Sequence, residues 1–369
     1  MGNTPPTHRR AVLVLEDGRS FYGRRMGAIE GEAFGEAIFN TSMTGYQEII
    51  TDPSYAGQIV AFTAPQIGNY GVARADGQAE RPVLGGVVIR ELSPVASNWR
   101  SEEALDDWLR RLGVVGITEV DTRALTRHLR ERGAMRAIIS DAEAEVETLR
   151  NRVIDSPGLG GRDLASTVST AERYEVAASG GCVGHVAVID FGVKRGILSA
   201  LAQRGLRLTV LPAKTDADEL RALKPDALFL SNGPGDPAPV ASGVALAKAL
   251  IGELPIFGIC LGHQILALAL GAKSFKMRFG HHGGNHPVRD LKSEAIWITA
   301  QNHSFAIEPK TLPSSAEVTH LSLYDGSLEG FALPEKRLFA VQFHPEGSPG
   351  PNDPAPLFDR FVTMIRGSA

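Results

Sequence analysis

Apolar strands alternate with amphipathic helices along the chain from His185 to about residue 270, and this pattern constrains the fold most strongly. The first expected strand, 186–190, is followed by an expected helix at 194–204. Further strands are expected at 207–211, 227–230 and 255–259, each followed by a helix, at 218–223, 240–251 and 261–270. Strands that alternate with helices in this way are typical of a parallel sheet covered on both faces. The sequence therefore predicts an α/β fold for residues 185–369, with a doubly wound, mostly parallel sheet.

Residues 1–150 show a different order, in which strands come first and helices later. Strand-like runs occur at 11–15, 20–22 and 37–39, and Asp17-Gly18 between the first two is typical of a hairpin turn. Helices are expected at 102–112 and 121–132, the second ended by Gly133. We therefore expect a smaller α+β domain at the N-terminus. The irregular, glycine-containing stretch within 151–184 is expected to be the linker region.

The composition is that of an ordinary soluble globular protein, with 43% hydrophobic and 22% charged residues. A net charge of −4 gives no general attraction to phosphate backbones, so no nucleic-acid partner is expected. The apolar stretch 254–272 is interrupted by proline, glycines and polar residues, and we expect a strand plus a helix there rather than a membrane span. Two cysteines cannot form a disulfide framework, which favours a cytoplasmic location.

Cys260 lies where a short apolar strand ends in Gly-Ile-Cys-Leu-Gly and a helix is expected to begin. A sharp strand-to-helix turn forces its central residue into strained backbone geometry and lifts the side chain clear of the sheet. The start of a helix also favours the thiolate form of a cysteine. A single cysteine in an apolar run is, however, commonly buried and unreactive. At this point both interpretations remain open.

Three polar features follow strands of the expected sheet: residues 231–237, Cys260, and the pair His344 and Glu346. The carboxyl ends of parallel strands meet at one edge, where ligands bind in open α/β sheets, so these features should converge. A cysteine nucleophile needs a base, and the base needs a group that orients it. We expect His344 and Glu346 in these two roles, although a histidine near a strand end can also be a surface or capping residue.

The turn at Gly233-Pro-Gly235 offers backbone N–H groups with no side chain in the way. Together with the N–H of Leu261, one of them could form an oxyanion hole. The alternative is a plain tight turn. A phosphate-binding loop is excluded, because neither Gly-Lys-Ser nor Gly-Lys-Thr occurs in the chain.

The histidines at positions 281, 282 and 286 suggest a zinc site, but no cysteine or acidic ligand accompanies them at the usual separations. We expect no metal and a well-defined loop at this point, near the active edge. The polar stretch 301–305 is a second patch, which could hold the charged end of an amino acid.

Three motifs together make a specific pattern: residues 257–264 around Cys260, residues 231–237, and Phe343-His-Pro-Glu346. With these motifs the chain resembles the class I, triad-type glutamine amidotransferases. Within that group it is similar to the family of small subunits of carbamoyl-phosphate synthetases. The narrower resemblance rests on further segments at 39–47, 51–55 and 276–287, and it covers nearly the whole chain.

The resemblance implies a role for each residue of the motif. Cys260 would attack the side-chain amide of glutamine, His344 would act as base and then as acid, and Glu346 would orient His344. Gly233 and Leu261 would supply the oxyanion N–H groups. One position departs from the family pattern, since Ser304 stands where glycine is common. The implied glutamine pocket consists of Ser54, Gly233, Gly235, Leu261, Gln264, Asn302, Ser304 and Phe305.

The resemblance also implies a partner and places the cofactors outside this chain. ATP and magnesium are expected on a large synthetase subunit, which would use the ammonia to make carbamoyl phosphate for arginine and pyrimidine biosynthesis. The expected assembly is a heterodimer or a higher oligomer. The N-terminal domain would be the docking surface, and arginines 123, 127, 130 and 132 on one helix could face an acidic partner or simply solvent.

Three other functions compete with this interpretation. They are a different class I amidotransferase, a free-standing hydrolase of γ-glutamyl compounds, and a catalytically silent binding or regulatory subunit. The N-terminal motifs argue against the first two. The presence of both Cys260 and His344 argues against the third.

Overall fold

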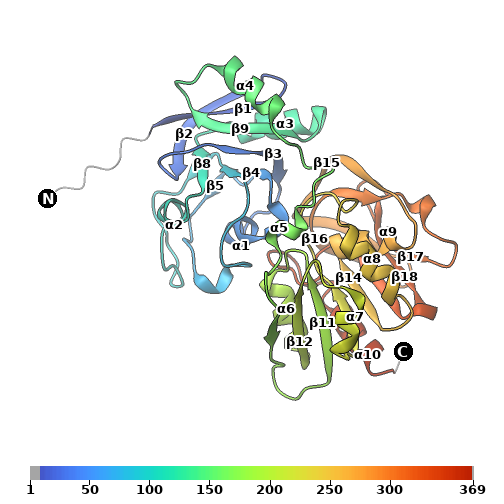
Figure 1. Ribbon diagram of the computed structural model, residues 1–369. Helices are drawn as coiled ribbons and strands as arrows, with labels where there is room; N and C mark the ends of the chain where they lie inside the picture. Colours follow the sequence, from blue (N-terminus) through green and yellow to red (C-terminus); the bar gives the residue numbers. More distant parts are fainter. Residues whose placement is uncertain (1–8, 368–369) are drawn as a thin grey trace. The chain divides into compact units, whose positions relative to one another are not determined.

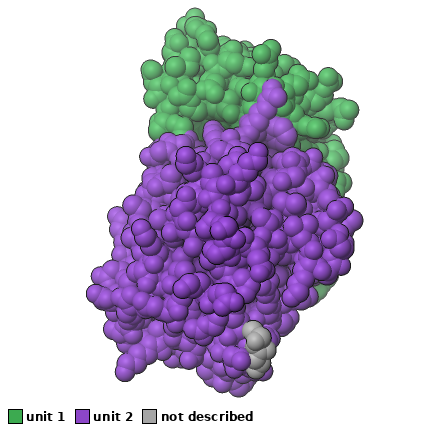
Figure 2. All heavy atoms as spheres, turned by 90° about the vertical axis from the view of Figure 1, so that its right-hand side faces the viewer, with its two compact units in different colours: residues 1–51, 57–158 green, residues 52–56, 159–369 purple. Residues whose placement is uncertain are grey.

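The computed structural model describes residues 9–367, which form two compact units. The first unit consists of the chain up to Gly158, without residues 52–56. The second unit consists of residues 52–56 and the chain from Leu159 onward. Figure 2 shows the two units in different colours. No helix among the described residues has both the length and the apolar character needed to cross a membrane.

The first unit is built on a closed barrel with the strand order β1-β2-β8-β6-β4-β3-β9 (Figure 1). The predicted hairpin is confirmed, because Val14 of β1 pairs with Ser20 of β2 and Gly18 in the turn has a φ of 91°. A separate pair, β5 with β7, is parallel. The strands are β1 (Arg10–Leu15), β2 (Ser20–Gly27), β3 (Ala33–Asn40), β4 (Gln58–Phe62), β5 (Gln66–Ile67), β6 (Gly86–Val88), β7 (Glu91–Leu92), β8 (Val115–Thr118) and β9 (Met135–Asp141).

The described part of this unit also contains the α-helices α1 (Tyr46–Thr51), α2 (Leu105–Arg111), α3 (Thr122–Arg132) and α4 (Val146–Asp155). The predicted helix at 121–132 is confirmed with its caps, because the side chain of Asp121 accepts a hydrogen bond from the N–H of Ala124 and Gly133 follows at a φ of 103°. Helix α2 begins later than predicted. Glu103 forms a β-bridge with Val72, and the backbone bonds of that bridge hold residues 102 and 103 out of the helix.

The second unit contains a ten-stranded sheet with the order β10-β12-β11-β13-β14-β19-β18-β17-β15-β16. The pairs from β12 through β19 are parallel, and the strands on either side of that block pair antiparallel. The strands are β10 (Tyr174–Val176), β11 (Gly184–Asp190), β12 (Leu206–Pro212), β13 (Ala227–Leu230), β14 (Ile256–Ile259), β15 (Ser274–Asp290), β16 (Ile296–Ile307), β17 (Glu317–Ser322), β18 (Leu328–Leu333) and β19 (Leu338–Val341).

Helices cover both faces of the parallel block. Alternate residues of β11 divide between two cores: Ala187 and Ile189 pack with one, Val186 and Val188 with the other. Helices α7 (Ala217–Ala222), α8 (Ala241–Leu250) and α9 (Leu261–Ala269) contribute to the first core, and α6 (Arg195–Ala202) and α10 (Pro356–Ile365) to the second. The predicted doubly wound α/β class is therefore confirmed, with an antiparallel extension that the strand–helix alternation does not encode.

The boundary between the units lies later than residue 150. That position falls inside α4, whose residues Leu149 and Val153 bury against Val12, Val14 and Ile138 of the first unit. Much of the expected linker, 151–184, belongs to the second unit, where α5 (Ala165–Val168) forms and β10 joins the sheet edge beside β12. The glycine and serine residues of this stretch do not predict a strand, and the three-residue strand β10 forms through its pairing with β12.

Candidate active site

Cys260 lies at the turn between β14 and α9, with a φ of 54° and a ψ of −102°. A positive φ at a residue that carries a Cβ costs on the order of 1–3 kcal/mol, so the surrounding structure must hold it. The glycines on both sides are required. A Cβ on Gly258 would lie 2.6 Å from Leu266 Cδ1, and one on Gly262 would lie 2.2 Å from the carbonyl oxygen of Leu230. The strained strand-to-helix turn predicted from the sequence is therefore confirmed.

His344 and Glu346 form the predicted pair just after β19. His344 Nδ1 lies 2.8 Å from Glu346 Oε1, and its backbone N–H donates to the carbonyl of Ala300. Because a carboxylate can only accept, Nδ1 carries the proton. Nε2 is buried and has no hydrogen-bond partner among the described residues. The imidazole therefore keeps a free lone pair on the nitrogen that a general base must use.

Lys194 completes the buried charge arrangement, and sequence reasoning missed it. Its Nζ forms an ion pair with Glu346 Oε1, donates to the carbonyl of Ser348 at 3.1 Å, and lies 4.0 Å from Asp52 Oδ2. Burial alone would raise the pKa of Glu346, but Lys194 and His344 outweigh it and lower that pKa to about 2. Burial would lower the pKa of Lys194, and Glu346 and Asp52 raise it instead. Both groups are therefore charged at neutral pH.

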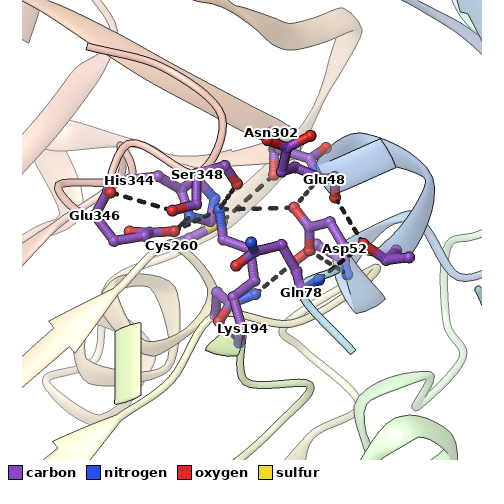
Figure 3. A network of polar contacts seen from close by, with 12 residues as sticks. Glu48, Asp52, Gln78, Lys194, Cys260, Asn302, His344, Glu346 and Ser348 are labelled. Atoms are coloured by element: carbon purple, nitrogen blue, oxygen red, sulfur yellow. Dashed lines mark hydrogen bonds and ion pairs between the residues drawn. The ribbon is translucent and has the colours of Figure 1, made fainter. Parts of the chain in front are cut away.

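The thiol of Cys260 is held in this network (Figure 3). Its Sγ lies 3.5 Å from the carbonyl of Asn302 and 3.6 Å from Nε2 of Gln342. Burial raises the pKa of the Cys260 thiol well above its usual range, and Asp52 adds to this, while Lys194 opposes it. The resting residue is therefore a thiol. It becomes a nucleophile only when its proton is transferred to a base.

The expected glutamine pocket is largely assembled from buried residues. Nδ2 of Asn302 donates to Asp52 Oδ2 at 3.0 Å, and Nε2 of Gln264 donates to the carbonyl of Phe305 at 2.7 Å. Ser54 accepts a hydrogen bond of 2.9 Å from Nδ2 of Asn232. These contacts join residues from η1 (Pro53–Tyr55), the loop after β13, α9 and β16.

The two glycines of the expected pocket, Gly233 and Gly235, pack against apolar side chains. A Cβ on Gly233 would come within 2.7 Å of Leu261 Cδ2, so this backbone lies directly beside the start of α9. Gly235 has a φ of 81° and lies beside Leu164, which packs in one cluster with Phe305. Ser304 lies between Asn302 and Phe305 in β16 and is also buried.

Several site residues were not predicted from the sequence, and each depends on a contact across the fold. Asp52 lies inside a motif that we noted, but its bond to Asn302 spans 250 residues. Gln342, which follows the end of the neighbouring strand β19, donates to Cys260. Lys194 follows β11 at the carboxyl edge of the sheet, a position that could have suggested a role.

The expected loop at 281–286 is wrong, because these residues belong to the long strand β15. His281 pairs with His303 and His282 with Asn302 in β16, with register shifts on either side. The glycines permit bulges rather than a loop, since β16 offers a continuous partner. His282 Nδ1 lies 2.9 Å from Asn302 Oδ1, so this strand supports the pocket. His281, His303 and Glu329 are grouped so that they could hold a metal ion.

Comparisons with known proteins agree across both units. The family description "Carbamoyl-phosphate synthase small chain, CPSase domain" matches residues 13–139, and "Glutamine amidotransferase class-I" matches residues 187–364. Proteins named carbamoyl phosphate synthase small chain are 50% identical in Salmonella typhimurium and in Escherichia coli K12, each alignment covering 97% of both chains. The protein of the same name in Yersinia pseudotuberculosis is 51% identical over 97% of this chain and 95% of that one.

Proposed function

This chain belongs to the carbamoyl-phosphate synthase small chain family, and from this premise we propose that it is the glutamine-hydrolysing subunit of that synthase. The observation that carries the proposal is the strained Cys260 at the end of β14 together with His344, which follows the adjacent parallel strand β19 and has an Nε2 free to take a proton. A buried thiol, a base and an orienting carboxylate are the parts that acyl transfer through a thioester requires.

In the first half of the reaction, Cys260 Sγ attacks the side-chain carbonyl carbon of glutamine while its proton passes to His344 Nε2. The carbonyl electron pair moves onto oxygen, where the N–H groups of Gly233 and Leu261 would stabilise the negative charge. As the intermediate collapses, the C–N bond breaks and His344 returns the proton to the leaving nitrogen. Ammonia departs and a γ-glutamyl thioester remains on Cys260.

In the second half, His344 takes a proton from water and the resulting hydroxide attacks the thioester carbon. The C–S bond breaks, Cys260 regains a proton from His344, and glutamate leaves. Glu346 keeps His344 in the required tautomer through both halves, because it accepts from Nδ1. Lys194 keeps Glu346 ionised, and the low pKa of that carboxyl supports this role.

The ammonia is a substrate for a reaction that this chain does not carry out. We propose that it passes to a large synthase subunit, which would hold ATP and magnesium and form carbamoyl phosphate from bicarbonate. The family name of this chain as a small chain supports such a partner. We also propose a cytoplasmic location and a role in arginine and pyrimidine synthesis, and the two free cysteines are consistent with a reducing compartment.

The proposal is tested by combining the pure chain with a synthase large subunit, ATP, magnesium and bicarbonate. With Cys260→Ser, formation of carbamoyl phosphate from glutamine should fall to background, while formation from added ammonia should continue at the wild-type rate. Cys182→Ser is the matched control, because Cys182 is exposed and belongs to no part of the site. Glutamine-driven synthesis that survives in Cys260→Ser would refute the assignment of the nucleophile.

A further inference from the structure

A second group of buried polar side chains lies on the antiparallel extension of the sheet and takes no part in the reaction above. His281 comes from β15, His303 from β16 and Glu329 from β18. Both histidines are 5% exposed and Glu329 is fully buried. One potential ligating atom from each residue lies within 4.8 Å of the other two. The three donors therefore surround a single small volume.

The atoms that face this volume have few partners. Neither Oε1 of Glu329 nor Nδ1 of His281 has a hydrogen bond within the described part of the chain, and the two atoms lie 3.5 Å apart. The other oxygen of Glu329 accepts a bond of 2.8 Å from Gln301 Nε2. A buried carboxylate is costly unless a cation or several donors compensate it. Glu329 therefore has one hydrogen-bond donor, Gln301, and its other oxygen faces only Nδ1 of His281.

In each histidine, the ring nitrogen that points away from this volume, which we call the outer nitrogen, lies beside a hydrogen-bond acceptor. His281 Nε2 lies 3.0 Å from Asp325 Oδ2, and His303 Nδ1 lies 2.8 Å from the carbonyl of Phe305. A histidine that binds a metal usually donates its other N–H to a carboxylate or a backbone carbonyl in this way. With these outer bonds in place, a neutral His281 carries its lone pair on Nδ1 and a neutral His303 carries its lone pair on Nε2. Burial would lower the pKa of His281, but Asp325 and Glu329 raise that pKa to about 9, so a metal ion that binds Nδ1 must displace a proton from it.

The remaining contact of His303 is unfavourable while Glu329 is ionised and holds the amide of Gln301 in its present orientation. Nε2 of His303 lies 3.0 Å from Gln301 Oε1, and the amide of Gln301 is already oriented by its bond to Glu329. A neutral imidazole carries one N–H, so it cannot donate both to Phe305 and to Gln301. A metal ion bound to Nε2 would remove the conflict, with Gln301 turned away from it.

We propose that His281, His303 and Glu329 bind one divalent transition-metal ion of the zinc class. Two imidazoles and a carboxylate are a donor set that zinc accepts, and oxygen-preferring ions such as magnesium or calcium would be poorly matched. The ion would join β15, β16 and β18 and would brace the strand that carries Asn302. His286 lies beside this cluster, with its ring centroid 5.1 Å from that of His281, but it is not one of the three grouped donors.

The site differs from the zinc pattern that the sequence suggested. The sequence places His281, His282 and His286 close together without an acidic ligand. In the structure His282 binds Asn302 instead, and the carboxylate comes from Glu329, more than 40 residues later in the chain. A search for local spacing could not find this combination.

The test measures zinc in the full-length protein directly. After purification without chelators or a metal-affinity tag, we expect about one zinc per chain by elemental mass spectrometry. After removal by a chelator, zinc should rebind with one-to-one stoichiometry in calorimetry and raise the melting temperature by several degrees. Cobalt should give the visible absorption of a nitrogen–oxygen site. None of these readouts depends on enzyme activity.

The variants Glu329→Gln and His281→Asn should each lose stoichiometric zinc, and circular dichroism would verify that they fold. Asp325→Asn changes an outer partner only, and its zinc affinity should fall by about 10–100-fold. His320→Asn is the matched control, because His320 is a buried histidine of β17 outside the cluster, and it should bind zinc as the wild type does.

A simpler occupant is a proton, since a protonated His281 would form an ion pair with Glu329. In that case the wild-type protein would bind zinc no more tightly than Glu329→Gln, and zinc would leave its melting temperature unchanged. Either result would overturn the proposal. Zinc binding that persists in both Glu329→Gln and His281→Asn would overturn it as well.

Discussion

Lys194 shows how much a single buried side chain contributes at the residue scale. Its ammonium group has carboxylates on two sides, Glu346 in an ion pair and Asp52 at 4.0 Å. Removing one partner of a buried ion pair typically costs about 3–5 kcal/mol, because the other charge is left uncompensated. Lys194→Met should therefore destabilise the protein by about this amount in urea unfolding.

The same variant should lose most glutamine-driven activity, since Glu346 would no longer be held ionised beside His344. Lys214→Met provides the control, because Lys214 is exposed and its loss should leave both stability and turnover unchanged. A Lys194→Met protein as stable and as active as the wild type would show that the ion pair has no function.

Glu346 makes stability depend on acid pH. Its pKa is lowered to about 2 from an ordinary value of 4.5, so the folded state favours the ionised form. The resulting stabilisation is fully present above pH 4.5 and is lost as the pH falls from 4.5 through 2, and it amounts to roughly 3 kcal/mol. Unfolding free energies of wild type and Glu346→Gln should converge over that range and differ most near neutral pH. A difference that does not change with pH would contradict the assignment.

The role of a residue could be predicted from the sequence where a local motif determines it. It could not be predicted where it depends on a contact between residues far apart in the chain. Cys260, His344 and Glu346 follow strand ends, so the edge rule for parallel sheets places them together. Lys194 also follows a strand, but nothing in its own segment shows that it meets a carboxylate about 150 residues later in the chain. The same is true of Asp52, because its partner Asn302 lies in β16, 250 residues later in the chain.

At the scale of elements, the turn between β14 and α9 depends on Gly262. A Cβ at this position would lie 2.2 Å from the carbonyl oxygen of Leu230, which is backbone and cannot rotate away. Gly262→Ala should cost about 1–3 kcal/mol of stability and should abolish glutamine hydrolysis, because the start of α9 would shift under Leu261. Gly160→Ala meets no atom within 4 Å and should change stability by less than about 0.5 kcal/mol. Equal behaviour of the two variants would contradict the requirement for glycine.

Elements were predicted well where local signals are strong. The helix 121–132 has both caps in its sequence, and the Asp17-Gly18 hairpin has its turn residues. The strand β15 was missed because its glycines resemble a loop, and only pairing with β16 holds them extended. The start of α2 was misplaced for a similar reason, since a bridge to Val72 overrides the local preference of residues 102 and 103.

At the scale of the whole molecule, the two family descriptions account for most of the chain, one in each compact unit. The sequence contains no phosphate-binding loop, whereas synthesis of carbamoyl phosphate from bicarbonate and ammonia consumes ATP. These family descriptions fit the proposal that this chain carries out half of a reaction: it releases ammonia from glutamine, and a large subunit would use that ammonia.

The most direct test of this account follows the nitrogen atom. The chain and a synthase large subunit are supplied with ATP, bicarbonate, glutamine labelled with heavy nitrogen in its side-chain amide, and a modest concentration of unlabelled ammonium. Carbamoyl phosphate is then analysed by mass spectrometry. We predict mostly labelled product with the wild-type chain, and only unlabelled product with Cys260→Ser. Labelled product from Cys260→Ser, or only unlabelled product from the wild-type complex, would contradict the account.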